Sequence, residues 1–345
     1  MRTARRLGAH IRGGYLWLED KPLVVVVVAA GATLAVAAVL ASYTGFPHVW
    51  RLVHARHNWP WLLGCLGGEL VAYAGYVFTL RDMARVDAGN DLALGTSAKT
   101  VVAGFGVFAA TRSSGGFAVD YWAFREAGSS RRDAVRRVVG LGLLEYVVLS
   151  IAALVASFLL YFDLDGGAGD TVTLPGLLIV PALALGLWLT SPDRARRLIH
   201  RRSGVVTRLV SDTVAGAVTV RQLFTSPRAH GLGVLGNVLY WAGDMFCLWA
   251  ALQFVGAELS ASKLILAYSG GYVLTRRALP AGGAGFVEVA LTIALVGMGV
   301  RFTPALVAVL VYRLFNFWLP IVPALALMPA IRDLRERFHR AEQTA

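Results

Sequence analysis

The chain has 345 residues, of which 57% are hydrophobic and 16% are charged. Soluble domains average about 45–50% apolar and about 25% charged residues, so this composition excludes a disordered chain and argues against a soluble enzyme. The formal net charge is +12, but the basic residues lie in blocks between apolar runs, as they do in the loops of polytopic membrane proteins. We therefore expect a membrane protein that binds no nucleic acid.

Six apolar segments are long enough to cross the membrane, since about 20 residues span the hydrocarbon core. The first follows a basic N-terminal segment, residues 1–22, and its apolar part is too long for a secretory signal. We expect it to remain as a helix. The predicted spans are residues 22–50, 61–80, 138–162, 171–190, 231–255 and 304–328.

Two further apolar stretches, residues 98–121 and 264–300, are interrupted in the middle by glycine-rich polar runs. Non-helical backbone at membrane depth is tolerated only where protein or a water-filled cavity satisfies its polar groups. We therefore predict two re-entrant helical hairpins. Their breaks contain Arg112, Gly115 and Gly116 in the first, and Arg276, Arg277, Gly282 and Gly283 in the second.

The basic residues favour one orientation. With six spans, two hairpins and both termini inside, 25 of the 33 basic residues fall in cytoplasmic segments and only 4 fall outside. This bias follows the positive-inside rule. The pattern predicts a multi-pass protein of a bacterial plasma (inner) membrane, with a cytoplasmic N-terminus and a cytoplasmic tail over residues 331–345.

The two hairpins resemble each other. A shift of 164 positions aligns Lys99 with Lys263 and Arg112 with Arg276. Each half, residues 23–165 and 166–330, contains three full crossings and one hairpin, so the second half starts on the opposite side of the membrane. The fold class that we predict is therefore an all-α integral membrane protein built as an inverted repeat, as in many transporters.

Charged side chains inside the bilayer cost about 2.5–3.5 kcal/mol each on insertion scales, so each needs a reason to be there. One interpretation is structural pairing between arginines and carboxylates. The other is a polar cavity for an anionic headgroup, because guanidinium groups bind phosphate through paired hydrogen bonds. The candidate headgroup residues are Arg112, Arg276, Arg277, Arg313, Gly115, Gly116, Gly282 and Gly283, and the coupling or pairing carboxylates are Glu69, Asp120, Glu145, Asp244 and Glu288.

Other chemistry has little support in the sequence. Cys65 and Cys247 both lie in apolar segments and are best interpreted as buried hydrophobic residues. The histidines show no metal-ligand spacing, and no nucleophile motif is present. We expect no metal, no cofactor and no enzymatic activity.

The run from Leu279 to Glu288, with Pro280, Gly282, Gly283 and Gly285, is followed by the pair Tyr312-Arg313. This pattern resembles the flippase-like membrane domain found in lysylphosphatidylglycerol synthases. The resemblance implies movement of a lipid across the bilayer, often an aminoacylated phosphatidylglycerol or a glycolipid. It carries a headgroup-contacting or gating role over to Arg112, Arg276, Gly282, Gly283, Glu288 and Arg313.

The chain departs from that family in its first half. Ser113-Ser114-Gly115-Gly116 stands where the family usually has a proline and a Gly-Glu pair, and Glu145-Tyr146 stands where it has Glu-Arg. The soluble aminoacyl-transferase domain is missing from this sequence, so we do not expect the chain to make a lysyl-lipid by itself.

Together these features favour a flippase-like transporter of a phosphate-bearing lipid, either a phospholipid or a polyprenyl phosphate. Its expected partners are the anionic lipid and the membrane, with a lipid-synthesising enzyme as a further candidate. Three alternatives remain open. They are a secondary transporter of a small soluble anion, a non-transporting scaffold for a lipid-modifying enzyme and a membrane-embedded transferase.

Overall fold

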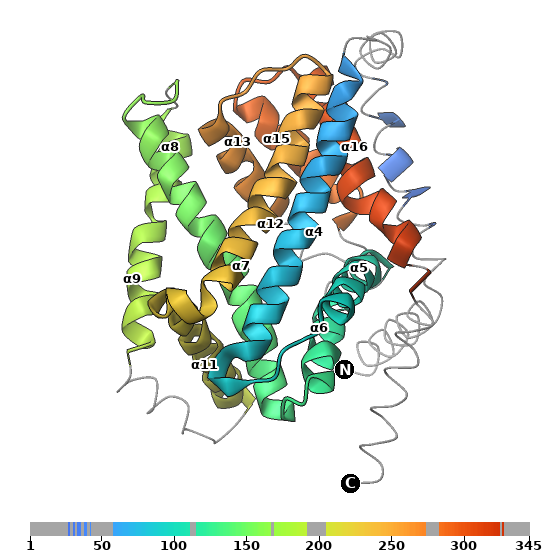
Figure 1. Cartoon of the computed structure of the whole chain (residues 1–345). Coiled ribbons are helices and arrows are strands. Elements are labelled where there is room, and N and C mark those ends of the chain that lie inside the picture. The colour runs from blue at the N-terminus through green and yellow to red at the C-terminus, as the bar shows by residue number, and fades with distance from the viewer. Residues whose placement is uncertain are drawn as a thin grey trace, which may run out of the picture.

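A computed structural model describes residues 58–110, 115–166, 169–191, 205–273, 283–324 and 326–327, with isolated residues of the 27–42 segment. Every element in the described part of the chain is helical. Helix α4 (Pro60–Arg85) runs from the upper to the lower end of the molecule in Figure 1. The chain returns upward in α7 (Arg131–Tyr161) and again in α12 (Pro227–Phe254).

In the described part of the chain, four helices are long and apolar enough to cross a membrane, and each matches a predicted span. They are α4, α7, α12 and the helix over Phe302–Ala324. The last consists of α16 (Phe302–Arg313), the π-helical turn η5 (Leu314–Trp318) and a final helical turn. The predicted span over residues 22–50 lies almost wholly outside the described residues.

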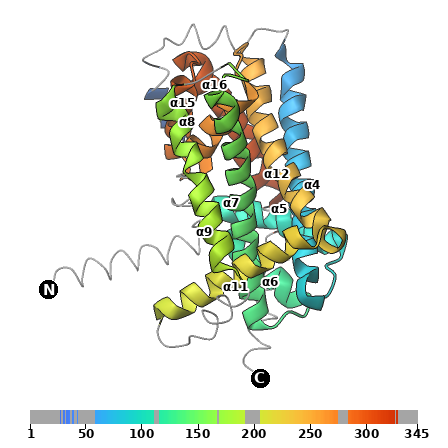
Figure 2. The ribbon, with the colours of Figure 1, turned by 90° about the vertical axis from the view of Figure 1, so that its left-hand side faces the viewer.

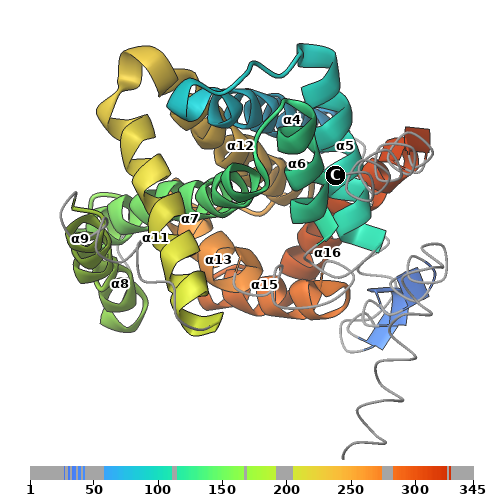
Figure 3. The same cartoon turned by 90° about the horizontal axis from the view of Figure 1, so that it is seen from below.

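The expected span over residues 171–190 is not one continuous helix. It is divided at Leu178 into α8 (Asp170–Leu177) and α9 (Ile179–Leu189). Pro175 and Pro181 both lack an amide hydrogen, so neither donates to the carbonyl four residues before it, and these missing bonds weaken the helix around Leu178. Seen from below, α8 and α9 lie at the periphery, beside α7 (Figure 3).

The basic segment after α9 contains a helix that the sequence analysis did not predict. This helix, α11 (Val205–Thr225), runs across the lower end of the molecule (Figure 2). It packs against α7 where Gly216 meets Gly140. A Cβ on Gly216 would lie 2.9 Å from the amide nitrogen of Gly140, so only glycine permits this approach.

Two pairs of shorter helices flank the predicted breaks. Helices α5 (Leu94–Ala110) and α6 (Gly115–Glu126) pack against each other on either side of residues 111–114. Helix α13 (Ala261–Tyr268) continues into the π-helical turn η3 (Ser269–Val273), which packs against α15 (Phe286–Gly297) beyond residues 274–282. The first pair lies toward the lower end of the long helices and the second toward the upper end (Figures 1 and 2).

Helices α4 and α12 cross antiparallel with their backbones in direct contact. Two reciprocal glycine contacts form the crossing, Gly68 with Gly243 and Gly75 with Gly236. A Cβ on Gly68 would lie 2.6 Å from the Gly243 carbonyl oxygen, and one on Gly75 would lie 2.4 Å from that of Gly236. Small residues allow such close approach between membrane helices.

We predict that Gly68→Val destabilises the protein by about 1–3 kcal/mol, because its side chain would push α4 away from α12. The buried thiols of Cys65 and Cys247 provide the measurement. A thiol-reactive dye should label them only on thermal unfolding, and at a lower temperature in this variant.

Gly67→Ala is the matched control, since nothing lies within 4 Å of a Cβ at this position. We expect it to be neutral or slightly stabilising, because alanine favours a helix over glycine by about 1 kcal/mol. Equal unfolding temperatures for Gly68→Val and the wild type would show that the crossing is not as tight as described.

Candidate functional site

The crossing of α4 and α12 places two carboxylates in the centre of the bundle. Glu69 and Asp244 each follow a glycine of the Gly68–Gly243 contact, and their exposed fractions are 5% and 0%. Glu69 lies within electrostatic range of Asp244 and in side-chain contact with Cys247 and Asn316. The interior of the bundle is therefore polar at its closest helix crossing.

Asp244 is held by a shell of hydrogen-bond donors from three other elements, α13, α16 and η5. The hydroxyl of Tyr268, the last residue of α13, donates to Oδ2. Tyr312 and Asn316 both donate to Oδ1, each at 2.8 Å. Tyr312 and Asn316 are four residues apart on α16 and η5, so they occupy one helix face. These hydrogen bonds connect α12 to α13 on one side and to α16 and η5 on the other.

A buried ion pair lies beside this shell. Arg313 Nε donates to Glu288 Oε1 at 2.9 Å, and the two side chains are 1% and 0% exposed. The guanidinium carbon lies 4.1 Å from the centre of the Phe317 ring, a favourable cation–π distance. Burial of two charges is costly, and only close pairing offsets that cost.

Glu288 also fixes the start of α15. Its Oε2 accepts a hydrogen bond of 2.6 Å from the amide of Gly285, three residues earlier. Gly283 and Gly285 have φ values of 69° and 85°, a region that favours glycine. These two positions explain part of the glycine-rich run, because the chain must turn sharply before the helix begins.

A second carboxylate cluster lies where α4, α6 and α7 meet. The Tyr76 hydroxyl lies 3.2 Å from Asp120 Oδ2 and 3.3 Å from Glu145 Oε1. Trp241 Nε1 donates to the backbone carbonyl of Glu145 at 2.9 Å, which ties this cluster to α12. Asp120 and Glu145 are 4% and 1% exposed.

All five predicted carboxylates are therefore buried, together with Arg313. Gly115 and Gly116 form the first residues of α6, and Gly283 is buried before α15. Arg112, Arg276, Arg277 and Gly282 lie outside the described residues. Among the described residues, Glu288 pairs with Arg313.

Sequence reasoning missed most of the hydrogen-bond donors. Tyr76 and Tyr268 lie in apolar runs, where a tyrosine resembles an ordinary core residue. Buried Asp82 was also missed. Its Oδ2 accepts a 2.6 Å hydrogen bond from the Gly233 amide, and its Oδ1 lies 3.8 Å from His230 Nδ1.

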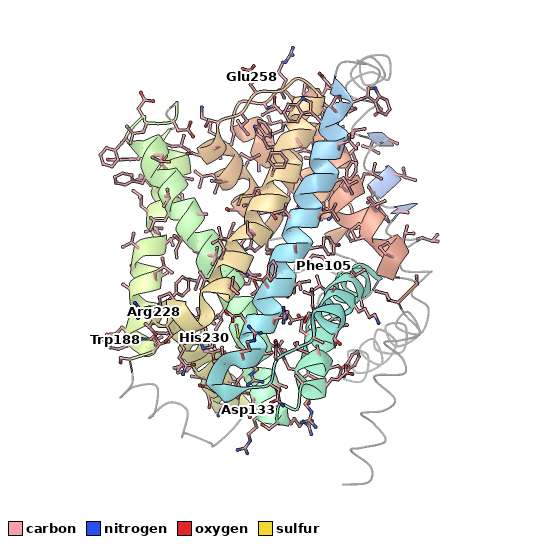
Figure 4. All side chains as sticks on the ribbon, in the orientation of Figure 1. Phe105, Asp133, Trp188, Arg228, His230 and Glu258 are labelled. Carbon is pink, nitrogen blue, oxygen red and sulfur yellow. The ribbon has the colours of Figure 1, made fainter. Side chains whose placement is uncertain are left out.

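Charge is distributed unequally between the two ends of the bundle. At the upper end, the acidic residues Asp163, Asp165 and Glu258 accompany Lys263 and Arg301. Figure 4 shows Glu258 at this end and Asp133, Arg228 and His230 toward the other. The lower end carries the described basic residues Arg81, Arg85, Arg125, Arg131, Arg132, Arg136, Arg137, Arg221 and Arg228, which outnumber the described acidic residues there, Asp82, Asp87, Asp91, Glu126, Asp133 and Asp212.

Loop contacts at the two ends fix the helix termini. At the lower end, the hydrogen bonds of Arg85 and Arg81 hold the pKa of Asp91 below its usual value, and Arg85 Nη2 lies 2.7 Å from Asp91 Oδ2. At the upper end, contacts from Ser262 lower the pKa of Asp165, which accepts from the Ser262 amide at 2.9 Å. Both carboxylates lie at the surface, so they position loops more than they stabilise the fold.

The described residues contain no group of three His, Cys, Asp or Glu side chains placed to hold a metal ion. The buried ionisable groups of this part of the chain are instead carboxylates, the guanidinium groups of Arg137 and Arg313, and tyrosine hydroxyls. Such groups bind anions or protons and exchange hydrogen bonds within a helix bundle.

The fold and its buried ionisable residues define a polytopic helical membrane protein with a polar core. Residues 23–324 match the family described as the lysylphosphatidylglycerol synthase TM region. The match covers most of the chain, so the protein belongs to this family, and the resemblance seen in the sequence is confirmed. No curated protein matches the chain.

We predict strong coupling between Arg313 and Glu288. Arg313→Gln or Glu288→Gln alone leaves one buried charge without its partner and should cost about 3–5 kcal/mol. The double variant should lose less than the sum of the two, by about 1 kcal/mol or more. Thermal unfolding in detergent measures all three variants. Arg301→Gln, at an exposed position, is the control, and additive losses would contradict the pairing.

Proposed function

We propose that this protein moves a phosphate-bearing lipid, a phospholipid or a polyprenyl phosphate, across a bacterial plasma membrane without altering it chemically. The observation that carries this proposal is the buried cluster of Glu69, Asp244, Glu288 and Arg313 around the α4–α12 crossing. Ionisable groups inside a membrane bundle mark substrate or ion pathways by default. Membership of the lysylphosphatidylglycerol synthase TM region family supports a lipid substrate.

The arrangement of the helix pairs supports alternating access. The pairs α5/α6 and α13–η3/α15 lie toward opposite ends of the long helices (Figure 1). We interpret them as re-entrant hairpins of an inverted repeat. Upstream of the hairpins, Gly67-Gly68-Glu69 resembles Ala242-Gly243-Asp244. Under that interpretation Gly68 and Gly243 are equivalent positions, and we propose that the repeat axis passes close to their contact. Transporters with such repeats bind substrate at this interface.

In this mechanism each hairpin break opens toward one side of the membrane. Arg112 and Arg276 bind the lipid phosphate in turn, and Arg313 exchanges part of its contact with Glu288 for the phosphate. Guanidinium groups suit this role because they bind either carboxylate or phosphate with paired hydrogen bonds. The glycine-rich breaks offer backbone N–H groups to the same anion.

The charge distribution supports one orientation. The basic lower end of the bundle faces the cytoplasm under the positive-inside rule, which puts both termini on the cytoplasmic side. The basic residues described at the lower end of the bundle are then available to anionic lipid headgroups or to a lipid-synthesising enzyme that delivers the substrate.

Reconstituted vesicles containing fluorescent phosphatidylglycerol test the proposal. A membrane-impermeant quencher destroys fluorophores in the outer leaflet, so transport appears as additional loss of signal from inner-leaflet lipid. The wild type should show this loss. Arg276→Ala should abolish it while the protein still inserts and unfolds cooperatively, because the phosphate loses a guanidinium partner.

Arg301→Ala removes an arginine at the exposed upper end and serves as the matched control. Transport by Arg276→Ala at the wild-type rate would contradict the site. Inhibition by glycerol phosphate, which has the headgroup chemistry without acyl chains, would favour the soluble-anion alternative. Absence of transport with stoichiometric co-purification of an enzyme would favour the scaffold alternative.

A further inference from the structure

Glu69 is a buried carboxylate that takes no part in the Arg313–Glu288 ion pair. It is 5% exposed, and its Oε1 atom has no hydrogen-bond partner among the described residues. Arg313 is already paired with Glu288. In the part of the chain that the structure describes, no basic side chain contacts Glu69. A buried oxygen of this kind is costly unless a ligand or a proton occupies it.

Among the described residues, the charged group that acts on Glu69 is another acid. Asp244 faces it across the α4–α12 crossing, and Cys247 lies one helical turn further along α12. On α4 itself, the titratable residues one turn away are Cys65 and Tyr73, and Cys65 Sγ donates to the Cys247 carbonyl at 3.5 Å. From other elements, Tyr268 on α13 and Tyr312 on α16 donate to Asp244, and Arg313, the residue after Tyr312, pairs with Glu288 on α15.

Two facing carboxylates in a low-dielectric interior cannot both stay ionised without strong repulsion. One proton between them removes that repulsion and leaves a single negative charge. The donors Tyr268, Tyr312 and Asn316 all converge on Asp244, so the remaining charge is best stabilised there. Glu69 is then the carboxyl that carries the proton.

We propose that Glu69 and Asp244 share one proton and that this proton is the coupling ion of the transport cycle. The coupling rests on the proposed lipid transport, whereas the proton site does not. In each cycle an O–H bond forms on the pair as a hydronium ion on one side gives up its proton. The bond breaks when water on the other side accepts that proton. The transmembrane proton gradient supplies the free energy.

The hydrogen-bond shell suggests how protonation and movement are linked. Tyr268 directly precedes the π-helical turn η3, and Asn316 lies within the π-helical turn η5. π-helical turns inside helices are often found at functional sites. A shift of α13 or η5 relative to α12 removes a hydrogen-bond donor from Asp244. The negative charge on Asp244 is then less stable, so the proton moves toward Asp244 from Glu69. Lipid-driven helix movement and proton exchange would thereby affect each other.

Infrared difference spectroscopy tests the proton site without any transport. A protonated carboxyl has a carbonyl stretching band that a carboxylate lacks. We expect purified wild type at neutral pH to show this band, with a shift in deuterated water, and Glu69→Gln to lose it. Glu258→Gln makes the same change on an exposed carboxylate and should leave the band unchanged (Figure 4). Absence of the band from the wild type would overturn proton sharing.

Vesicles with a pH gradient and a clamped membrane potential test the coupling. One proton per lipid predicts that a gradient of about one pH unit drives about a tenfold difference in fluorescent phosphatidylglycerol between leaflets. Glu69→Gln should lose this response, and Glu258→Gln should keep it. A wild type that equilibrates lipid regardless of the gradient would overturn the coupling and leave the proposed function standing. A wild type with the infrared band but no lipid movement would overturn the proposed function and its coupling, and support the proton site alone.

Discussion

The backbone contact between α4 and α12 is the constraint on which the rest of the structure depends. Two pairs of glycines, Gly68 with Gly243 and Gly75 with Gly236, allow the helices to touch without intervening side chains. The side chains that follow these glycines are thereby forced together. Glu69 and Asp244 meet because their neighbours lack a Cβ, and the surrounding elements are organised to satisfy what this contact buries.

The polar groups form a cluster inside an otherwise apolar bundle. Large apolar side chains such as Leu63, Leu70 and Phe158 are exposed on the outer surface, where lipid would cover them. The interior holds carboxylates, tyrosine hydroxyls and the Arg313–Glu288 pair. Hydrocarbon cannot hydrogen-bond these groups, so each depends on partners supplied by neighbouring helices. Polar contacts therefore connect α12 to α7, α13 and α16.

Much of the architecture could be predicted from the sequence because membrane insertion imposes simple rules. Long apolar runs predicted α4, α7, α12 and α16, and isolated charges within them predicted the buried carboxylates. The interruption at Leu178 was not predicted, because the span over residues 171–190 was identified by its hydrophobicity alone. Pro175 and Pro181 lack the backbone donor that a continuous helix needs. Helix α11 was missed because it lies in a basic segment too polar to suggest a span.

The partners of the buried groups were harder to predict than the groups themselves. The partner of each buried side chain depends on which sides of the helices pack together, and a single sequence does not specify this. Glu288 pairs with Arg313, 25 positions away, through the turn that Gly283 and Gly285 allow. Tyr268 reaches Asp244 only because α13 packs beside α12. The residue types predicted which charged side chains are buried. The hydrogen bonds that these side chains form depend on how the helices pack together.

Under the proposed function, this polar core binds an anionic lipid through Arg112 and Arg276, the arginines of the two breaks. Native mass spectrometry of gently solubilised protein tests it most directly, with the wild type beside the double variant Arg112→Ala/Arg276→Ala. We expect the wild type to retain a specific phosphate-bearing lipid and the double variant to lose it. If both proteins retain the same lipids to the same extent, lipid binding through these arginines is contradicted. Their role would then be structural pairing with carboxylates.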